Sequence, residues 1–156
     1  DIILIDSSPC LNDEMLSAMV ASDELLVVTS PDYPTLSTTL QAVRLAKQKR
    51  TPITGMIINR VRNKNFELSI EDIEKTAGVP VLSVLKEDLK VPESVYYTTP
   101  VTLYNQKASS AIEFKKLAAS LIGETYKDPR IFQKIKDIFK KDILRENVNR
   151  MLMQND

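Results

Sequence analysis

Four short apolar runs, separated by helical patterns, constrain the fold of this chain more than any other feature of the sequence. They span residues 2–5, 25–28, 53–58 and 79–85. Each run is continuous rather than alternating, and valine and isoleucine dominate, which is typical of strands buried on both faces of a parallel sheet. Such strands are joined by right-handed crossovers through helices. The sequence therefore predicts an α/β fold, with a parallel sheet of about four strands and flanking helices.

Helical patterns fill the intervals between these runs, at residues 11–21, 36–47 and 69–76, and return at residues 108–122. Ser69, followed by Asp72, is close to a capping box, and Gly123 is predicted to end the last of these helices. Between residue 85 and the last helix we expect a loop, a short helical turn and a second loop. Tyr96 and Tyr97 in this stretch are either a stacking platform for a base or ordinary tyrosines over a core.

The composition excludes several classes of function. The chain has no histidine, which excludes Ser–His–Asp, Cys–His and histidine-metal sites within it. Its single cysteine, Cys10, excludes an internal disulfide and favours a reducing compartment. A formal net charge of +0 offers no field for direct nucleic-acid binding. No apolar run is long enough to span a membrane, so we expect a cytoplasmic protein. The start at Asp1, inside an apolar run, suggests a fragment.

Polar residues follow each of the four apolar runs, and those after the second run are Thr29, Ser30 and, beyond Pro31, Asp32. Asp6 comes directly after the first run, Asn59 after the third, and residues 86–88 after the fourth. In open parallel sheets, ligands bind beyond the carboxyl ends of the strands. An aspartate followed by a small hydroxyl residue is what magnesium-nucleotide chemistry requires, because the carboxylate holds the hydrated metal. The same pattern is equally typical of an aspartate that caps the next turn, and both interpretations stay open.

These segments resemble, in order, the MinD/ParA family of P-loop ATPases. The stretch "DIILIDSSPCL" is similar to the Walker B and switch II segment of the family. The stretch "VASDELLVVTSPDYPTLSTTLQAVRLAK" is similar to the family's next strand, loop and helix. The stretch "ITGMIINRVRN" resembles the family strand that ends in an asparagine and an arginine. The stretch "GVPVLSVLKEDLKVPESVYYTTPV" matches the MinD-like branch best. The resemblance implies that the sheet is part of a P-loop NTPase fold.

On the phosphate side, the resemblance assigns roles to the first loop of the chain. Asp6 would be the catalytic and metal-binding residue, because it would hold the magnesium shell. The loop that senses the terminal phosphate would contain Ser7, Ser8 and Pro9. The implied cofactors are therefore ATP and Mg²⁺.

On the base side, the resemblance implies that Asn59 hydrogen-bonds the adenine, that Arg60 flanks it, and that a loop edges it, formed by Lys86, Glu87 and Asp88. An asparagine amide presents a donor and an acceptor together, which suits an edge of adenine. The alternative for Asn59 is a cap after a strand. For Glu87 and Asp88, a solvated loop at a helix entry is as good an interpretation as a contact with the base.

Two departures from the family pattern bear on enzyme activity. A phosphate-binding P-loop needs a glycine-rich turn and a lysine, but none of the three glycines, Gly55, Gly78 and Gly123, precedes a lysine. The P-loop lysines must then come from a segment outside this chain, so ATP hydrolysis is expected only of the full-length protein. Cys10 and Leu11 also stand where MinD proteins usually carry a glycine.

The sequence predicts two parts, an ATPase part of residues 1–124 and an extension of residues 125–156. Within the extension, residues 130–144 have the pattern of an amphipathic helix. Its isoleucines and phenylalanines fall within an arc of about 140° on a helix. Residues 127–145 carry seven basic and three acidic side chains. Such a helix can lie on an anionic membrane, as the MinD resemblance implies. The alternative is a helix that docks on its own domain or on a partner.

The leading hypothesis is therefore a portion of a MinD/ParA-like ATPase. The intact protein would bind Mg·ATP, form a homodimer, and cycle on and off a surface, peripheral to the inner face of the membrane. It would position cell-division or other cellular machinery through a regulatory or cargo protein. The alternative is a nucleotide-free pseudo-ATPase that keeps the fold as a scaffold or localisation module.

Overall fold

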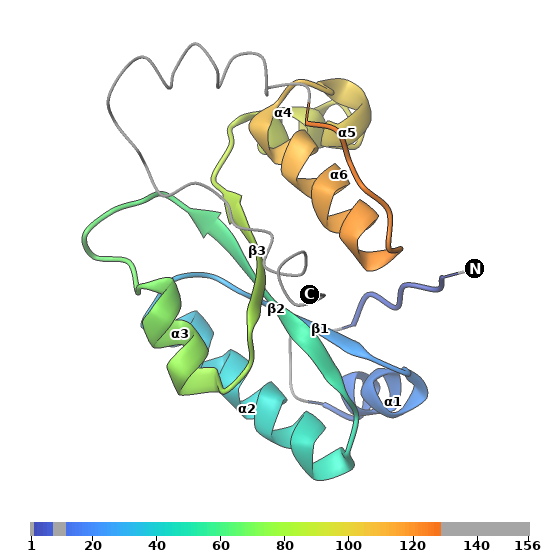
Figure 1. Ribbon diagram of the computed structural model, residues 1–156, viewed down its shortest axis with the longest axis vertical. Helices are drawn as coiled ribbons and strands as arrows, with labels where there is room; N and C mark the ends of the chain where they lie inside the picture. Colours follow the sequence, from blue (N-terminus) through green and yellow to red (C-terminus); the bar gives the residue numbers. More distant parts are fainter. Residues whose placement is uncertain (1, 8–11, 129–156) are drawn as a thin grey trace. The chain divides into compact units, whose positions relative to one another are not determined.

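The computed structural model describes residues 2–7 and 12–128. Three parallel strands form one sheet in the order β1-β2-β3, flanked by helices (Figure 1). The strands are β1 (Leu25–Thr29), β2 (Ile53–Val61) and β3 (Val81–Lys86). The helices in the described part of the chain are α1 (Asp13–Ala21), α2 (Tyr33–Lys49), α3 (Ile70–Ala77), α4 (Lys90–Tyr96), α5 (Val101–Tyr104) and α6 (Ser109–Leu121). The predicted α/β class and parallel sheet are confirmed.

The first apolar run does not form the strand that was predicted. Residues 2–7 have no regular secondary structure, and the side chains of Ile3 and Leu4 are 87% and 81% exposed. A short run becomes a strand only where a neighbouring strand supplies backbone hydrogen bonds and packing covers its faces. Neither is supplied to this run by the described residues. The sheet therefore has three strands here, instead of about four.

Side-chain caps determine where the helices begin. Asp32 accepts a hydrogen bond from the Thr35 N–H at 2.9 Å, and Pro34 lies in the first turn. Helix α2 therefore begins at Tyr33, earlier than its apolar pattern predicts. Ser69 accepts from the Asp72 N–H at 3.0 Å and donates to the Asp72 carboxylate at 2.8 Å. This variant of the capping box confirms the predicted start of α3.

The chain divides into two compact units, of which the first comprises residues up to 58 and residues 64–81. In this unit β1 and β2 are parallel, with Val27 opposite Met56 and Thr29 opposite Ile58. Helix α2 packs on β1 and on α3. The fully buried side chains include those of Val43, Met56 and Ile73. These are residues of the predicted runs and helices, and they form the core of the unit.

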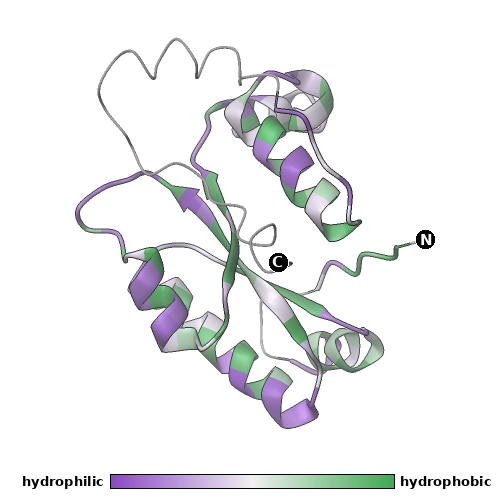
Figure 2. Cartoon of the chain, viewed as in Figure 1, coloured by the Kyte–Doolittle hydropathy of each residue, from purple (hydrophilic) through white to green (hydrophobic). Residues whose placement is uncertain are grey.

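The second unit comprises residues 59–63 and the chain from residue 82 onward. Its helices α4, α5 and α6 pack in sequence on one another. A small core joins them, formed by Val101, Ala108 and Ala111 with Val91 against it. The predicted single turn after residue 85 is thus two short helices. Figure 2 shows hydrophobic residues along β3 and mixed hydrophilic and hydrophobic bands on α6.

Among the described residues, no helix combines the length and the apolar character that crossing a membrane requires.

Candidate functional site

The predicted base-binding asparagine lies inside a strand rather than after it. Asn59 and Arg60 belong to β2, close to its carboxyl end. Arg60 has a φ of 57°, a left-handed conformation that is uncommon for a residue other than glycine. The Arg60 N–H donates to the Asn59 Oδ1 at 2.9 Å. Strained residues cluster at active sites and ligand-binding sites, so the conformation of Arg60 is consistent with a binding role here.

The loop after β3 lies beside the end of β2. Lys86 is the last residue of β3, and the Glu87 N–H donates to the Val61 carbonyl at 3.0 Å. The five residues predicted for the base side therefore belong to one compact unit, at the carboxyl ends of two parallel strands. This is the edge at which open parallel sheets bind their ligands.

An arginine that sequence reasoning missed connects these two strand ends. The Arg62 Nε lies 2.5 Å from the Glu87 Oε2, and the second guanidinium nitrogen of Arg62 lies 2.9 Å from Oε1. Two parallel bonds of this kind fix a carboxylate in orientation as well as in place. The hydrogen bond and charge of Arg62 hold the pKa of Glu87 below its usual value of 4.5, against a smaller opposing effect of burial. In the sequence, the only indication of a role for Arg62 is that it repeats the arginine of "NRVR".

Replacing Arg62 with methionine is expected to raise the pKa of Glu87 toward 4.5, because the donor that stabilises the carboxylate is removed. The pair is half-exposed, so the stability of the fold should change little. An NMR titration of the Glu87 side-chain carboxyl measures the shift. Arg44→Met, at an exposed position of α2, is the control and should leave the pKa of Glu87 unchanged. An unaltered Glu87 titration in Arg62→Met would contradict the assignment.

Asp88 has a structural role in this loop. Its Oδ1 accepts from the Lys90 N–H at 2.9 Å, while its Oδ2 accepts from the Ser110 N–H at 3.1 Å and hydroxyl at 2.9 Å. One carboxylate thus joins the first turns of α4 and α6. Burial opposes ionisation, but these donors together keep the pKa of Asp88 below its usual value of 3.8. The arrangement holds the loop after β3 in one conformation.

The phosphate-side residues are described only in part. Asp6 and Ser7 lie in the irregular segment 2–7 and are exposed, and they belong to the first unit. Ser8 and Pro9 lie outside the described residues. Within the described ranges, no cluster of three or more acidic or thiol side chains could hold a metal ion. An aspartate with water and phosphate oxygens is nevertheless a normal ligand set for magnesium, so Asp6 suits a metal that is bound together with a nucleotide.

Comparisons with known proteins identify the family. A family model described as an AAA domain matches residues 7–95, which is more than half of the chain. The chain belongs to this family. Within it, the MinD/ParA-like resemblance is confirmed. An uncharacterized ATP-binding protein of Methanocaldococcus jannaschii is 33% identical over 126 residues, covering 81% of this chain and 48% of that protein.

Solved structures agree with the MinD/ParA-like assignment. The cell division ATPase MinD of Pyrococcus furiosus superposes with a TM-score of 0.67 at 28% identity, over 73% of this chain and 48% of that one. MinD of Pyrococcus horikoshii, complexed with Mg-ADP, gives a TM-score of 0.66 at 28% identity, over 72% and 46%. The MinD/ParA-like chain thus spans about half the length of the relatives it matches.

Proposed function

We propose that this chain supplies the base-binding part and the metal-binding aspartate of a MinD-like ATPase. The whole protein binds Mg·ATP, hydrolyses it, and forms a homodimer. It cycles on and off an anionic membrane, where it positions cell-division or other cellular machinery. Membership of the AAA-domain family and the likeness to MinD of two Pyrococcus species support the ATPase. The basic, amphipathic sequence of residues 130–144, which lie outside the described residues, supports the membrane step.

The observation that carries the nucleotide proposal is the arrangement around Asn59. The side-chain oxygen of Asn59 is held by the Arg60 N–H, and no acceptor for its Nδ2 is present among the described residues. The Arg62–Glu87 pair and the two Asp88 caps fix the backbone of the loop after β3. Asn59 can then donate from Nδ2 to a ring nitrogen of adenine, while backbone groups of the loop bind the same base edge. Such a rigid polar edge selects a base at little entropic cost.

In this proposal each of the other predicted site residues has its own role. Asp6 holds a water of the magnesium shell, and bound magnesium supplies charge stabilisation at the phosphates. Ser7, Ser8 and Pro9 form the loop against the terminal phosphate. Arg60 flanks the base, and Lys86 ends the strand that presents the loop. Glu87 and Asp88 act through their fixed carboxylates, which position the loop backbone.

The experiment that tests this proposal is Asn59→Ala in the whole ATPase that contains this chain. Loss of one net hydrogen bond, of about 1–1.5 kcal/mol, should weaken ATP binding about ten-fold. GTP binding should change less, because the lost contact is to the adenine edge. Fluorescence anisotropy with labelled ATP and GTP measures both affinities. Asn65→Ala, at an exposed loop position, is the control and should change neither.

The same measurement distinguishes the two functions that the sequence leaves open. Equal weakening for ATP and GTP would mean that Asn59 supports the fold rather than the base. If the unmodified whole protein binds no nucleotide, the proposal that it is an ATPase is wrong. The pseudo-ATPase scaffold is then the remaining function.

A further inference from the structure

A pocket lies at the amino-terminal ends of β2 and β3, where α2 and α3 end. Its volume is about 320 Å³, and its lining residues all belong to the first compact unit. Pro52 and Ile53, at the start of β2, and Val79 and Pro80, just before β3, give it an apolar lining. Figure 1 shows the end of α2 beside the start of β2. The pocket shares no residue with the candidate nucleotide site, whose Asn59 lies near the other end of β2.

Basic side chains from the last turns of α2 surround this pocket. Lys47 and Arg50 line it, and Arg44 precedes Lys47 by three residues, a spacing that places neighbouring side chains on one face of a helix. The Lys47 ammonium donates to the Ala77 carbonyl at 3.3 Å, which holds it at the edge of the pocket. Among the described residues, none of these three cations forms an ion pair. Their charge is therefore available to a ligand.

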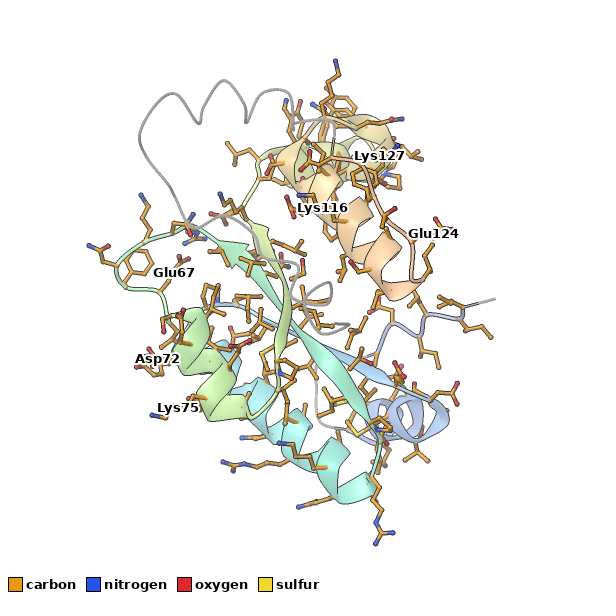
Figure 3. All side chains as sticks on the ribbon, viewed as in Figure 1. Glu67, Asp72, Lys75, Lys116, Glu124 and Lys127 are labelled. Atoms are coloured by element: carbon orange, nitrogen blue, oxygen red, sulfur yellow. The ribbon has the colours of Figure 1, made fainter. Side chains whose placement is uncertain are left out.

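Acidic side chains of the first unit do not balance this charge. The carboxylates of Glu24 and Glu74 accept hydrogen bonds from residues of β2 and β3, and neither lines the pocket. Figure 3 shows Glu67 and Asp72 near the start of α3, and Lys75 nearer the end that adjoins the pocket. The surface around the pocket is therefore positive, although the chain as a whole is neutral. A local field of this sign favours an anionic ligand.

The backbone of Arg50 is a second, independent sign of function at this pocket. Arg50 ends α2 in the left-handed conformation, with a φ of 60° and a ψ of 25°. Glycine normally occupies such a position because it has no Cβ, and Gly78 ends α3 with the same φ of 60°. An arginine there costs conformational free energy that a glycine would not, and strained residues of this kind cluster at binding sites. The strain therefore favours a role for the Arg50 guanidinium itself.

We propose that this pocket is a docking site for an acidic peptide segment of a partner protein. One aliphatic side chain of the peptide fills the pocket, and flanking carboxylates pair with Arg44, Lys47 and Arg50, since a guanidinium binds a carboxylate through two parallel hydrogen bonds. The pocket is at the lower limit of small-molecule sites, which begin at about 300 Å³, and Arg44 extends the basic surface beyond it. None of the described lining residues is aromatic, so a nucleic-acid base has no ring to stack on. Docking needs no nucleotide and is independent of the proposed ATPase function.

Fluorescence anisotropy of a labelled peptide with the whole protein that contains this chain tests the docking. The peptide is fluorescein-labelled Gly-Glu-Glu-Leu-Glu-Glu-Gly, in about 0.15 M salt, which screens distant charges. It should bind with a Kd below about 1 mM, and Lys47→Glu should weaken binding about ten-fold because it places a repelling charge at the pocket. The matched control Lys49→Glu makes the same charge change two residues later, on another side of α2, and should weaken binding less than about two-fold. No binding to the unmodified protein, or equal weakening in the two variants, would overturn the proposal.

Changes in the ligand test the pocket without altering the protein. Serine in place of the leucine should weaken peptide binding about five-fold, because no apolar side chain then fills the pocket; undiminished binding would overturn the proposal. A labelled oligothymidylate of six nucleotides should bind more weakly than the peptide, and tighter binding would assign the basic surface to nucleic acid instead. Hexanoate should displace the peptide only at concentrations far above the Kd of the peptide. Displacement at equal concentration would mean a small-molecule site and would also overturn the proposal.

Discussion

Lys116→Met is expected to destabilise the protein by about 3 kcal/mol, since it removes the ammonium group that forms ion pairs with two buried carboxylates. The ammonium of Lys116 lies 2.7 Å from the Asp128 carboxylate and 3.3 Å from that of Glu113. The side chains of Asp128 and Glu113 are only 7% and 6% exposed, so water cannot replace the lost charge. Urea unfolding, followed by circular dichroism, measures the free energy of unfolding.

Neighbouring substitutions make this prediction specific. Lys115→Met removes the same charge one position earlier on α6 and should change the free energy of unfolding by less than about 0.5 kcal/mol. The double variant Lys116→Met with Asp128→Asn should recover part of the loss, because one of the two buried charges is removed as well. A loss in Lys116→Met no larger than that in Lys115→Met would show that the ion pair adds little to stability.

Asp88→Ala is expected to cost about 2 kcal/mol, because one carboxylate caps the first turns of two helices. Its Oδ1 binds the Lys90 N–H and its Oδ2 binds the Ser110 N–H and hydroxyl. Loss of a single cap typically costs about 1 kcal/mol. Asp88→Asn keeps one acceptor oxygen and should lose about half as much. Urea unfolding at neutral pH compares the two variants, and equal stability of Asp88→Ala and the unmodified chain would contradict the double cap.

The contribution of Asp88 should also depend on pH. Its pKa is lowered in the folded chain relative to the usual 3.8, since the donors of Lys90 and Ser110 outweigh the effect of burial. A lowered pKa means that the stabilisation is fully present above pH 3.8 and is lost as the pH falls through the folded pKa. The difference in unfolding free energy between the unmodified chain and Asp88→Asn should therefore be constant near neutral pH and shrink below about pH 4. A difference that stays constant down to pH 2 would contradict this assignment.

Most of the fold could be predicted from the sequence, because its signals are local. Continuous runs of valine and isoleucine predicted β1, β2 and β3, and Ser69 with Asp72 predicted the start of α3. The predictions failed where a distant strand decides whether a segment becomes a strand, or where a capping side chain decides the residue at which a helix begins. Residues 2–5 have the composition of a strand, but a strand needs a neighbour, and the described part of the chain supplies none. Helix α2 begins early because Asp32 caps it.

The candidate site divides in the same way. The position of Asn59 near the end of an apolar run is a pattern in the sequence, and its side chain could be nominated from that pattern alone. The left-handed backbone of Arg60 and the pairing of Arg62 with Glu87 could not be nominated. Both depend on the exact register in which β2 and β3 end, and no local preference encodes that register.

By itself, the sequence determined the α/β class, the order of the elements and the residue types at the strand ends. These follow from periodicity, from caps and from the chemistry of side chains, which act over a few residues. Only the tertiary structure decided that Asp88 joins two helices, that Lys116 pairs with Asp128, and that the ring of Tyr97 stacks on that of Tyr104. Each of these contacts links residues that are separated along the chain, and folding selects it through burial and geometry that a linear pattern does not contain.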